Sequence, residues 1–164
     1  MKKKICLNQS VLDFMESLLT PDSFVLELGA GWSSRWFADR CGYLLSVETS
    51  PQWASMVRFD LRDSACKWNV VKGSDKSITA AAGKANLVLV DSVANLREQY
   101  VKTVWPLLKR GCWLVFDDAQ RPIHADAIEY LNGFSNPIIL GWDAEHDVPA
   151  AKERVAMAWQ KCSF

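Results

Sequence analysis

Short apolar runs rich in strand-forming residues alternate with segments of helical periodicity along the chain. Within one domain, such alternation predicts a parallel sheet with helices packed on both faces. The runs that fit strands are residues 24–28, 42–48, 67–73, 86–91, 112–118, 137–142 and 153–161. Because crossovers between parallel strands are right-handed, we expect a doubly wound α/β order.

Apolar residues at helical spacing predict the helices that connect these strands. The predicted helices cover residues 9–19 and 33–40, a segment that begins at 51, and residues 96–107 and 122–131. Ser50 is the expected N-cap of the third helix, with Pro51 at its first position. No helix is assigned between the third and fourth strands, where "GSDKS" has the composition of a solvated loop. A polar loop joins the last two strands, so we expect them to pair antiparallel.

The composition is that of an ordinary globular chain. With 164 residues there is room for one domain, 1–164, around one core. The hydrophobic fraction of 49% argues against disorder, and a formal net charge of zero offers no electrostatic footprint for nucleic acid. No segment is apolar for long enough to span a membrane, and polar residues interrupt the stretch that would follow a signal peptide's basic start. We expect a cytoplasmic protein.

Cysteine usage agrees with a reducing compartment. The chain has five cysteines without CxxC spacing, so we expect free thiols rather than a zinc site or a disulfide framework. They are Cys6, Cys41, Cys66, Cys112 and Cys162.

The clearest functional pattern is the turn that follows the first predicted strand, "FVLELGAGWSSRWF". Gly29 and Gly31 lack a Cβ, so the chain can turn sharply and a ligand can approach the backbone. A helix that begins near Ser33 would present unpaired N–H groups to an anionic group. Glu48 ends the second strand 19 residues after Gly29, where a carboxylate can bind both hydroxyls of a ribose. The pattern indicates a nucleoside with an anionic tail.

Two ligand classes fit this pattern, a dinucleotide and S-adenosylmethionine. The dinucleotide fingerprint GxGxxG requires glycine at its sixth position, where this chain has Ser34. Glu27, two residues before Gly29, suits a ligand with an ammonium group, which a pyrophosphate lacks. A methionine tail carries an ammonium and a carboxylate, and Ser33 or Ser34 would cap the helix and donate to that carboxylate. These differences favour S-adenosylmethionine.

The segments "VLELGAG" and "LLSVETS" resemble the first two motifs of class I S-adenosylmethionine-dependent methyltransferases. "NLVLVDS" and "LLKRGCWLVFDD" resemble that family's fourth and fifth strands, so the resemblance covers nearly the whole chain. Ser33 replaces the family's usual third glycine. The resemblance implies a Rossmann-like sheet of seven mostly parallel strands, with the last strand antiparallel and helices on both faces.

The resemblance also implies a set of cofactor-binding residues. These are Glu27, Gly29, Ala30, Gly31, Ser33 and Ser34 for the methionine part, Glu48 for the ribose, Thr49 and Asp75 for the adenine, and Asp91 beside the cofactor. Asp75 has an alternative interpretation, since it lies in the same short segment that fits an ordinary loop.

Three aspartates follow adjacent predicted strands, Asp91 after the fourth and Asp117 and Asp118 after the fifth. Carboxylates that close together repel one another unless they are protonated or share a cation, and such oxygen ligands suit Mg²⁺. This arrangement is similar to the metal-dependent O-methyltransferases that act on catechols or on sugars of antibiotics. In those enzymes the ion lowers the pKa of a coordinated hydroxyl and aligns its oxygen with the methyl group. The alternative is that these aspartates only cap turns and a helix.

Asp91 and His124 are the candidate catalytic residues, His124 because its ordinary pKa lies near neutrality. His146, in the polar loop before the last strand, is a poorer candidate. The indole of Trp32 either lies near the cofactor or packs against the first helix, and Trp142 is a candidate to face a substrate. Four other tryptophans are expected in the core, namely Trp53, Trp105, Trp113 and Trp159.

The function that we expect is methyl transfer from S-adenosylmethionine to a hydroxyl of a small molecule. The first helix and the loop at 142–151 are the expected substrate cover, and a homodimer or a bulky substrate would complete the enclosure. A methyltransferase for protein or nucleic acid is an alternative, although "DSVAN" stands where the amide-methylating signature would be. A non-catalytic nucleoside-binding module is a third possibility. A nicotinamide dehydrogenase fits least, since no catalytic domain follows.

Overall fold

The computed structural model describes residues 5–73, 75–141 and 155–162. Its strands are β1 (Phe24–Leu28), β2 (Tyr43–Val47), β3 (Lys67–Val71), β4 (Leu87–Val90), β5 (Trp113–Phe116), β6 (Ile138–Leu140) and β7 (Ala156–Gln160). Its helices are α1 (Gln9–Leu18), α2 (Trp32–Ala38), α3 (Pro51–Leu61), α4 (Asp75–Ala82), α5 (Ala94–Val104) and α6 (Ala125–Asn132), with 3₁₀ turns η1 (Trp105–Leu107) and η2 (Pro122–His124).

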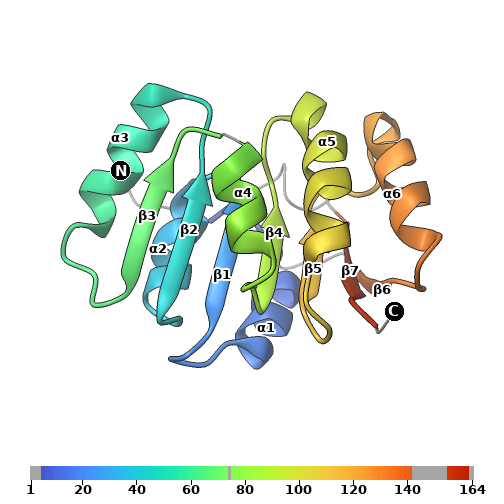
Figure 1. The fold of residues 1–164 in the computed structure, drawn as a ribbon, viewed down its shortest axis with the longest axis horizontal. Coiled ribbons are helices and arrows are strands. Elements are labelled where there is room, and N and C mark those ends of the chain that lie inside the picture. The colour runs from blue at the N-terminus through green and yellow to red at the C-terminus, as the bar shows by residue number, and fades with distance from the viewer. Residues whose placement is uncertain (1–4, 74, 142–154, 163–164) are drawn as a thin grey trace.

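In the described part of the chain the strands form one seven-stranded sheet in the order β3-β2-β1-β4-β5-β7-β6 (Figure 1). The pairs among β1 to β5 are parallel, and β7 is antiparallel to both β5 and β6. The Rossmann-like sheet and the antiparallel pairing of the last two strands are therefore confirmed. All four residues of β4 are buried, as expected for a strand that is covered on both faces.

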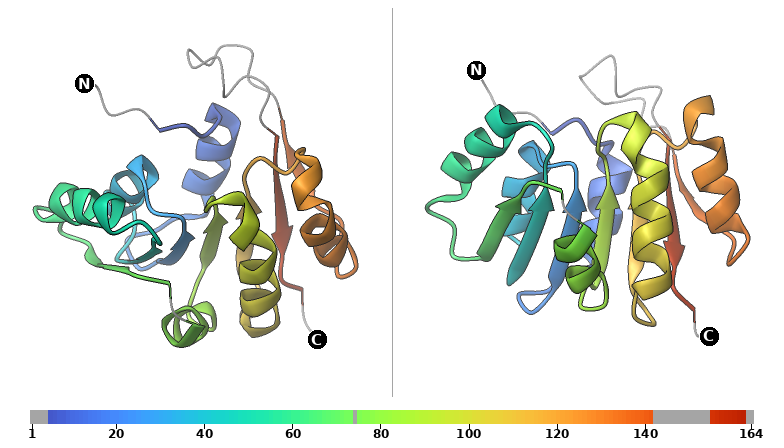
Figure 2. Two further views of the ribbon diagram at one scale, coloured as in Figure 1. Left: turned by 90° about the horizontal axis from the view of Figure 1, so that it is seen from above. Right: turned by 45° about the horizontal axis from the view of Figure 1, so that its top comes forward.

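Helices cover both faces of the sheet (Figure 2). Buried side chains of α1, α2 and α3 form one hydrophobic core with one face, and those of α4, α5 and α6 form a second core with the other face. Trp105 and Trp159 belong to the second core, as predicted. None of the helices that the structure describes has the length and apolar character needed to cross a bilayer.

Helix α4 is the element that the sequence interpretation missed. It begins at Asp75, inside the segment that fits a loop, and it buries Ile78, Ala81 and Ala82 in the second core. Alanine has the highest intrinsic helix propensity, and these positions share one helical face. The signal was therefore present in "SITAAA", but the polar residues before it obscured it.

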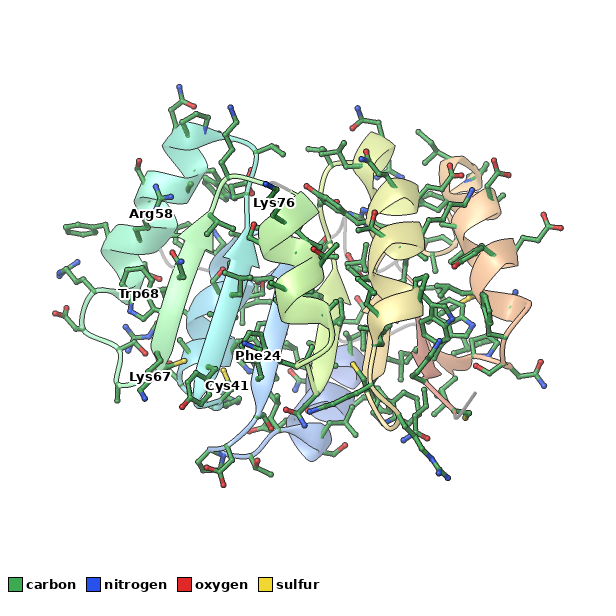
Figure 3. All side chains as sticks on the ribbon, in the orientation of Figure 1. Phe24, Cys41, Arg58, Lys67, Trp68 and Lys76 are labelled. Atoms are coloured by element: carbon green, nitrogen blue, oxygen red, sulfur yellow. The ribbon has the colours of Figure 1, made fainter. Side chains whose placement is uncertain are left out.

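Side-chain hydrogen bonds explain where α3 begins and how a carbonyl on the outer strand β3 is satisfied. The Ser50 hydroxyl accepts a hydrogen bond from the Trp53 N–H at 3.3 Å, so Ser50 is the N-cap of α3 as predicted. Arg58 of α3 donates through two nitrogens to the Val70 carbonyl on β3 (Figure 3). This guanidinium satisfies a carbonyl on an edge strand that has no further strand beside it.

The position of a ligand site follows from the strand order. The chain leaves β1 toward α2 on one face and leaves β4 toward α5 on the other face, although β1 and β4 are neighbours. In open α/β sheets, ligands bind outside the carboxyl ends of the strands at such a switch point. The site therefore has to be sought between the turn after Leu28 and the turn after Val90.

Candidate cofactor and active site

The turn after β1 is shaped by a close approach of two backbones. Gly29 has a φ of 109°, and a Cβ at this position would lie 2.4 Å from the carbonyl oxygen of Asp91. Only glycine fits both constraints. Gly31 differs, since its φ of −167° is extended backbone and a Cβ there would meet nothing closer than 3.9 Å. Gly29 is thus required by the fold, while Gly31 leaves space beside the turn.

Glu27, near the end of β1, is fully buried behind this turn rather than exposed in it. Its carboxylate accepts hydrogen bonds from the hydroxyls of Ser33 at 2.6 Å, Ser34 at 2.5 Å and Ser46 at 2.5 Å. The Ser34 hydroxyl also accepts from the Gly31 N–H at 3.0 Å. The network ties the glycine turn and the start of α2 to β2. Burial raises the pKa of Glu27 from 4.5 to about 7, although the three hydroxyls oppose that rise.

Two adjoining hollows lie in front of the turn. The larger has a volume of about 440 Å³ and the smaller about 160 Å³, and both are lined by Gly29, Ala30, Trp53 and Asp91. The larger hollow extends over Glu48, Thr49, Ser50, Gln52, Val93 and Tyr100. The smaller one extends over Gly31, Trp32 and Ser33, beneath Ile5, Cys6 and Leu7. Together they form one two-part cleft along the carboxyl ends of β1, β2 and β4.

Glu48 lies at the wall of the larger hollow, as expected for a ribose ligand. Its Oε1 accepts a hydrogen bond from the Ser50 N–H at 2.7 Å, and its own N–H donates to the Val71 carbonyl at 2.9 Å. These contacts fix the carboxylate at the end of β2. Thr49 is exposed beside it in the same hollow. Asp75 is the first residue of α4, and its side chain lies outside what the structure describes.

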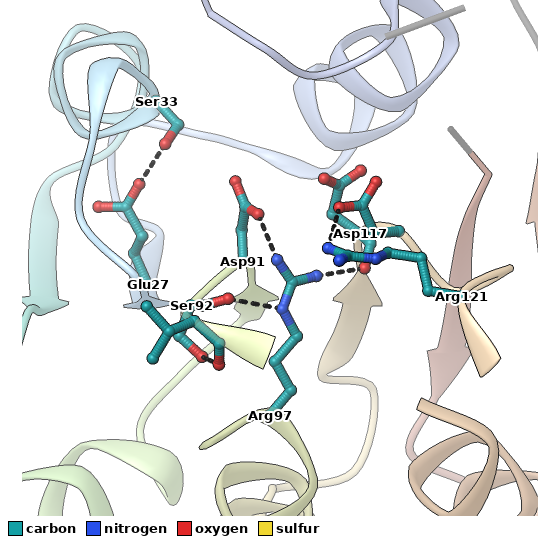
Figure 4. Close-up of polar contacts among 9 residues, drawn as sticks. Glu27, Ser33, Asp91, Ser92, Arg97, Asp117 and Arg121 are labelled. Carbon is teal, nitrogen blue, oxygen red and sulfur yellow. Dashed lines mark hydrogen bonds and ion pairs between the residues drawn. The ribbon is translucent and has the colours of Figure 1, made fainter. Parts of the chain in front are cut away.

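Asp91 follows β4 and is the acidic side chain that lines both hollows among the described residues. Its Oδ1 accepts from Nη2 of Arg97 at 2.9 Å, and the Asp91 side chain is 25% exposed (Figure 4). Glu27 and Asp91 are near enough for their charges to interact, since Asp91 contributes to the raised pKa of Glu27. The cleft thus has two acids in its wall, Glu48 and Asp91, and a third, Glu27, buried near them.

The predicted magnesium ligands do not come together. No group of three or more His, Cys, Asp or Glu side chains in the described ranges is arranged to hold a metal ion. Asp118 pairs with Arg121 at 3.4 Å, while the Asp117 carbonyl accepts from the Arg97 guanidinium. Asp117 and Asp118 are both buried, and neither lines a described part of the cleft. The described residues therefore do not present a set of oxygen ligands for a divalent ion here, since arginines contact the Asp91 and Asp118 carboxylates and the Asp117 carbonyl.

His124 lies at the end of η2 and is 1% exposed. Its ring packs edge-on against Phe116 at 5.1 Å between centroids, and Nε2 has no hydrogen-bond partner among the described residues. Burial lowers the pKa of His124, and the charges of Arg97 and Arg121 lower it further. The ring does not line the described cleft, so its catalytic role stays a prediction. Trp142 and His146 lie outside the described residues.

Several cleft residues were not recognised in the sequence. Trp53 was expected in the core, but it is 38% exposed and stands in the cleft wall, with its ring 5.7 Å from that of Trp32. Trp32 therefore contacts α3 and also lines the smaller hollow. Tyr100 was counted only as an apolar position of α5, yet it lines the larger hollow. Arg97, one turn before Tyr100, carries no motif that would have revealed it. The sequence pattern that could have pointed to Arg97 is the mixture of polar and apolar residues on one face at the start of α5.

Comparison with known proteins agrees with this architecture. A family model described as a methyltransferase domain matches residues 26–119, more than half of the chain. An rRNA methylase from Streptococcus thermophilus superimposes with a TM-score of 0.75 at 12% identity, over 99% of both chains. An O-methyltransferase from Bacillus cereus in complex with S-adenosylhomocysteine (SAH) gives 0.68 at 15% identity, over 93% of this chain and 78% of that one.

A precorrin-6y C5,15-methyltransferase from Geobacter metallireducens gives a TM-score of 0.68 at 16% identity, over 92% of this chain and 87% of that one. No curated protein sequence matches the chain significantly. At these identities the solved structures show the fold, and the reactions for which these proteins are named differ. The match to the family model covers the glycine turn, Glu48, Asp91 and β5. The chain therefore belongs to this family of methyltransferase domains, as a class I S-adenosylmethionine-dependent methyltransferase.

Proposed function

We propose that the protein transfers the methyl group of S-adenosylmethionine to a hydroxyl oxygen of a small molecule. The observation that carries this proposal is the two-part cleft around Gly29, with one carboxylate at its wall from Glu48 and another from Asp91. The larger hollow, about 440 Å³, is the proposed place of the adenosine. The smaller hollow, beside Gly31 and Ser33, is the proposed place of the methionine chain.

Each wall of the cleft has a proposed binding role. Glu48 would accept hydrogen bonds from the ribose hydroxyls, because its carboxylate is held at the end of β2 by the Ser50 N–H. Thr49 would lie at one face of the adenine, with Val93 and Tyr100 opposite. Glu27 would act from behind by holding the glycine turn, since its three serine partners separate it from the cleft.

The chemistry proposed for the site is an in-line displacement. The bound sulfonium supplies an electrophilic methyl group, and the carbon–sulfur bond breaks as the carbon–oxygen bond forms. The protein has to hold the two reacting atoms in line and exclude water. Asp91 stands where the two hollows meet, so its negative charge is the proposed partner of the cationic part of the cofactor. The acceptor hydroxyl releases one proton, and His124 remains a predicted base for it.

Two observations support a small hydroxyl compound as acceptor. The segment after β4 reads "DSVAN" and lacks the signature of amide methylation. The chain has a formal net charge of zero, which gives no general attraction for nucleic acid. A homodimer is the proposed way to enclose the acceptor, and size-exclusion chromatography with and without SAH tests it.

Methylation of RNA is the second candidate. The rRNA methylase from Streptococcus thermophilus is matched over 99% of both chains, so the two folds correspond along the whole of the compared sequences. An acceptor that brings its own bulk would need no such domain on the enzyme. This candidate predicts that activity falls steeply with salt, because phosphate contacts are salt-dependent.

The cofactor is tested by calorimetry and thermal unfolding of the purified chain with SAH, and with NAD as the matched control. We expect SAH to raise the melting temperature, since a ligand at about 100 times its Kd stabilises the folded state by about 2.7 kcal/mol. NAD should leave the melting temperature unchanged. Stabilisation by NAD and not by SAH would contradict the proposal.

The acceptor is tested by transfer of a tritiated methyl group to three pools, namely hydroxylated small molecules, total RNA and denatured protein. We expect label in the small-molecule pool, in a bond that resists mild base as an ether does. Label confined to RNA would favour the second candidate instead.

A further inference from the structure

Arg97 of α5 is a buried cation that contacts the ends of two strands. Its side chain is 5% exposed, and its three nitrogens donate to three different oxygens (Figure 4). Nε donates to the Ser92 carbonyl at 2.7 Å, Nη2 donates to Oδ1 of Asp91 at 2.9 Å, and Nη1 donates to the Asp117 carbonyl. One planar group thus joins the turn after β4 to the turn after β5.

The place of this arginine is electrostatically unfavourable for the helix that carries it. Arg97 is the fourth residue of α5, close to the positive end of the helix dipole. Burial of a guanidinium also costs free energy unless the charge is compensated and its donors are satisfied. Here the compensation comes from the carboxylate of Asp91, which lines both hollows of the cleft. An arginine held at such a cost indicates a role beyond packing in the helix.

Arg97 also lies where the resemblance to metal-dependent enzymes would put a cation. The three aspartates at these strand ends do not form a metal site among the described residues. The acceptor that Asp117 offers to the guanidinium is its main-chain carbonyl, and the side chain of Asp118 meets Arg121. The ring of Phe116 lies 5.7 Å from the guanidinium carbon and limits its movement from one side.

We propose that Arg97 is a positioning residue that replaces a divalent cation at this sheet edge. Its guanidinium holds the Asp91 carboxylate against the cofactor cleft and fixes the spacing of the turns after β4 and β5. This inference rests on the proposed cofactor. A lysine would keep the charge but cannot span three acceptors with one rigid fork, so the geometry of arginine is part of the inference.

The test measures SAH affinity by calorimetry for the wild-type chain, Arg97→Ala, Arg97→Lys and Arg121→Ala. Arg121 is the matched control, because it pairs with Asp118 while its side chain is 51% exposed. We expect Arg97→Ala to weaken SAH binding by about 10- to 100-fold, the range for a lost charge-assisted contact. Arg97→Lys should recover part of that loss, and Arg121→Ala should bind SAH within about twofold of wild type.

Chemical rescue separates positioning of Asp91 from general loss of packing. Ethylguanidinium added to Arg97→Ala should restore SAH affinity at least fivefold, while the uncharged N-ethylurea, of similar shape, should not. Equal rescue by both compounds, or SAH affinity unchanged in Arg97→Ala, would overturn the inference. If Arg97→Ala does not fold, Arg97→Lys decides, and wild-type affinity in that variant would overturn it.

A metal titration completes the experiment. We expect Mg²⁺ to change neither the SAH affinity nor the melting temperature of the EDTA-treated, SAH-saturated wild-type chain. A rise in either that Asp117→Asn abolishes would show a metal site here and contradict the inference. Failure of the wild-type chain to bind SAH at all would instead contradict the proposed function, so the two failures are distinguishable.

Discussion

Strands β1, β2 and β5 all end on the same edge of the sheet. Acidic residues lie at the β1–β2 end of this edge and also at its β5 end. At β2, Glu48 is partly exposed and lines the larger hollow. At β5, Asp117 and Asp118 are buried, with exposures of 1% and 6%, and arginines contact them. The difference lies in the turns. Near Glu48 the turn has no side chain at Gly29, whereas at the turn after β5 the side chains of Arg97 and Arg121 contact the two aspartates.

An acid at the end of a strand is therefore not sufficient evidence of a site. It becomes part of one when a neighbouring turn leaves room for a ligand, as the turn at Gly29 does. If this comparison is right, substitutions at the β1–β2 end should affect cofactor binding. Substitutions at the β5 end should leave SAH affinity close to that of the wild type.

The largest effect is expected from Gly29→Ala. The new methyl group would lie 2.4 Å from the Asp91 carbonyl oxygen at a φ of 109°, so the turn after β4 would have to move. We expect a loss of about 4 kcal/mol in the free energy of unfolding, measured by urea denaturation, and no detectable SAH binding.

The matched control is Gly31→Ala, whose Cβ would meet nothing closer than 3.9 Å. It should lie within about 0.5 kcal/mol of the wild-type stability. Because Gly31 lines the smaller hollow, any loss of SAH affinity in this variant reports on the ligand and not on folding. Equal destabilisation by the two substitutions would refute the assignment of separate roles to the two glycines.

The second effect concerns Glu27 and pH. Its pKa is about 7 in the folded chain and 4.5 ordinarily, so the folded state binds more protons between these values. The free energy of unfolding contributed by this group therefore falls as pH rises from 4.5 to 7, by about 3 kcal/mol in total. Glu27→Gln should remove this dependence, which urea denaturation at a series of pH values measures. Glu48→Gln is the control and should keep it.

The sequence predicted the sheet and the cofactor end of the site because both depend on local patterns. Strand bounds follow from apolar runs, and residues 24–28 were assigned without error. Gly29 and Glu48 are fixed by their places after consecutive strands, so spacing alone located them. The sequence also places Glu27 on the first strand, but it does not reveal that three serines from α2 and β2 donate to its carboxylate. The contact of Glu27 with the methionine part stays a prediction.

The β5 end could not be predicted in the same way. Whether three aspartates bind a metal or meet arginines depends on which side chains α5 and η2 bring to them. Arg97 reaches back to three oxygens on two turns, one of which lies 20 residues further along the chain. Such a contact depends on the packing of α5 against β5, which no local pattern encodes. For the same reason Trp53 was assigned to the core, although helix periodicity fits the wall of a cleft equally well.

The third effect is a loss of cofactor affinity without a loss of fold. Glu48→Gln keeps the size of the side chain and removes its charge, so the ribose contacts weaken. We expect SAH affinity to fall about tenfold by calorimetry, as for a hydrogen bond to a charged group. The variant Glu98→Gln, on an exposed face of α5, is the control and should bind as wild type does. An affinity in Glu48→Gln equal to that of the control would remove Glu48 from the proposed site.

The smallest effect on cofactor binding is expected at His124, the predicted base at the β5 end. His124→Leu removes a buried nitrogen that has no partner among the described residues, so SAH affinity should stay within about twofold of wild type.

Burial and two arginines hold the pKa of His124 below 6.5, so the folded state binds fewer protons than the unfolded state below that pH. The stability that His124 contributes should therefore fall on acidification from pH 7 to 5, so the leucine variant should gain stability relative to wild type over that range. If His124 is the base, transfer in this variant should lose an inflection that lies on the acid side of pH 6.5, because the pKa of His124 is lowered, while SAH still binds. Transfer that keeps the wild-type pH profile would mean that the ring only fills the space behind Phe116.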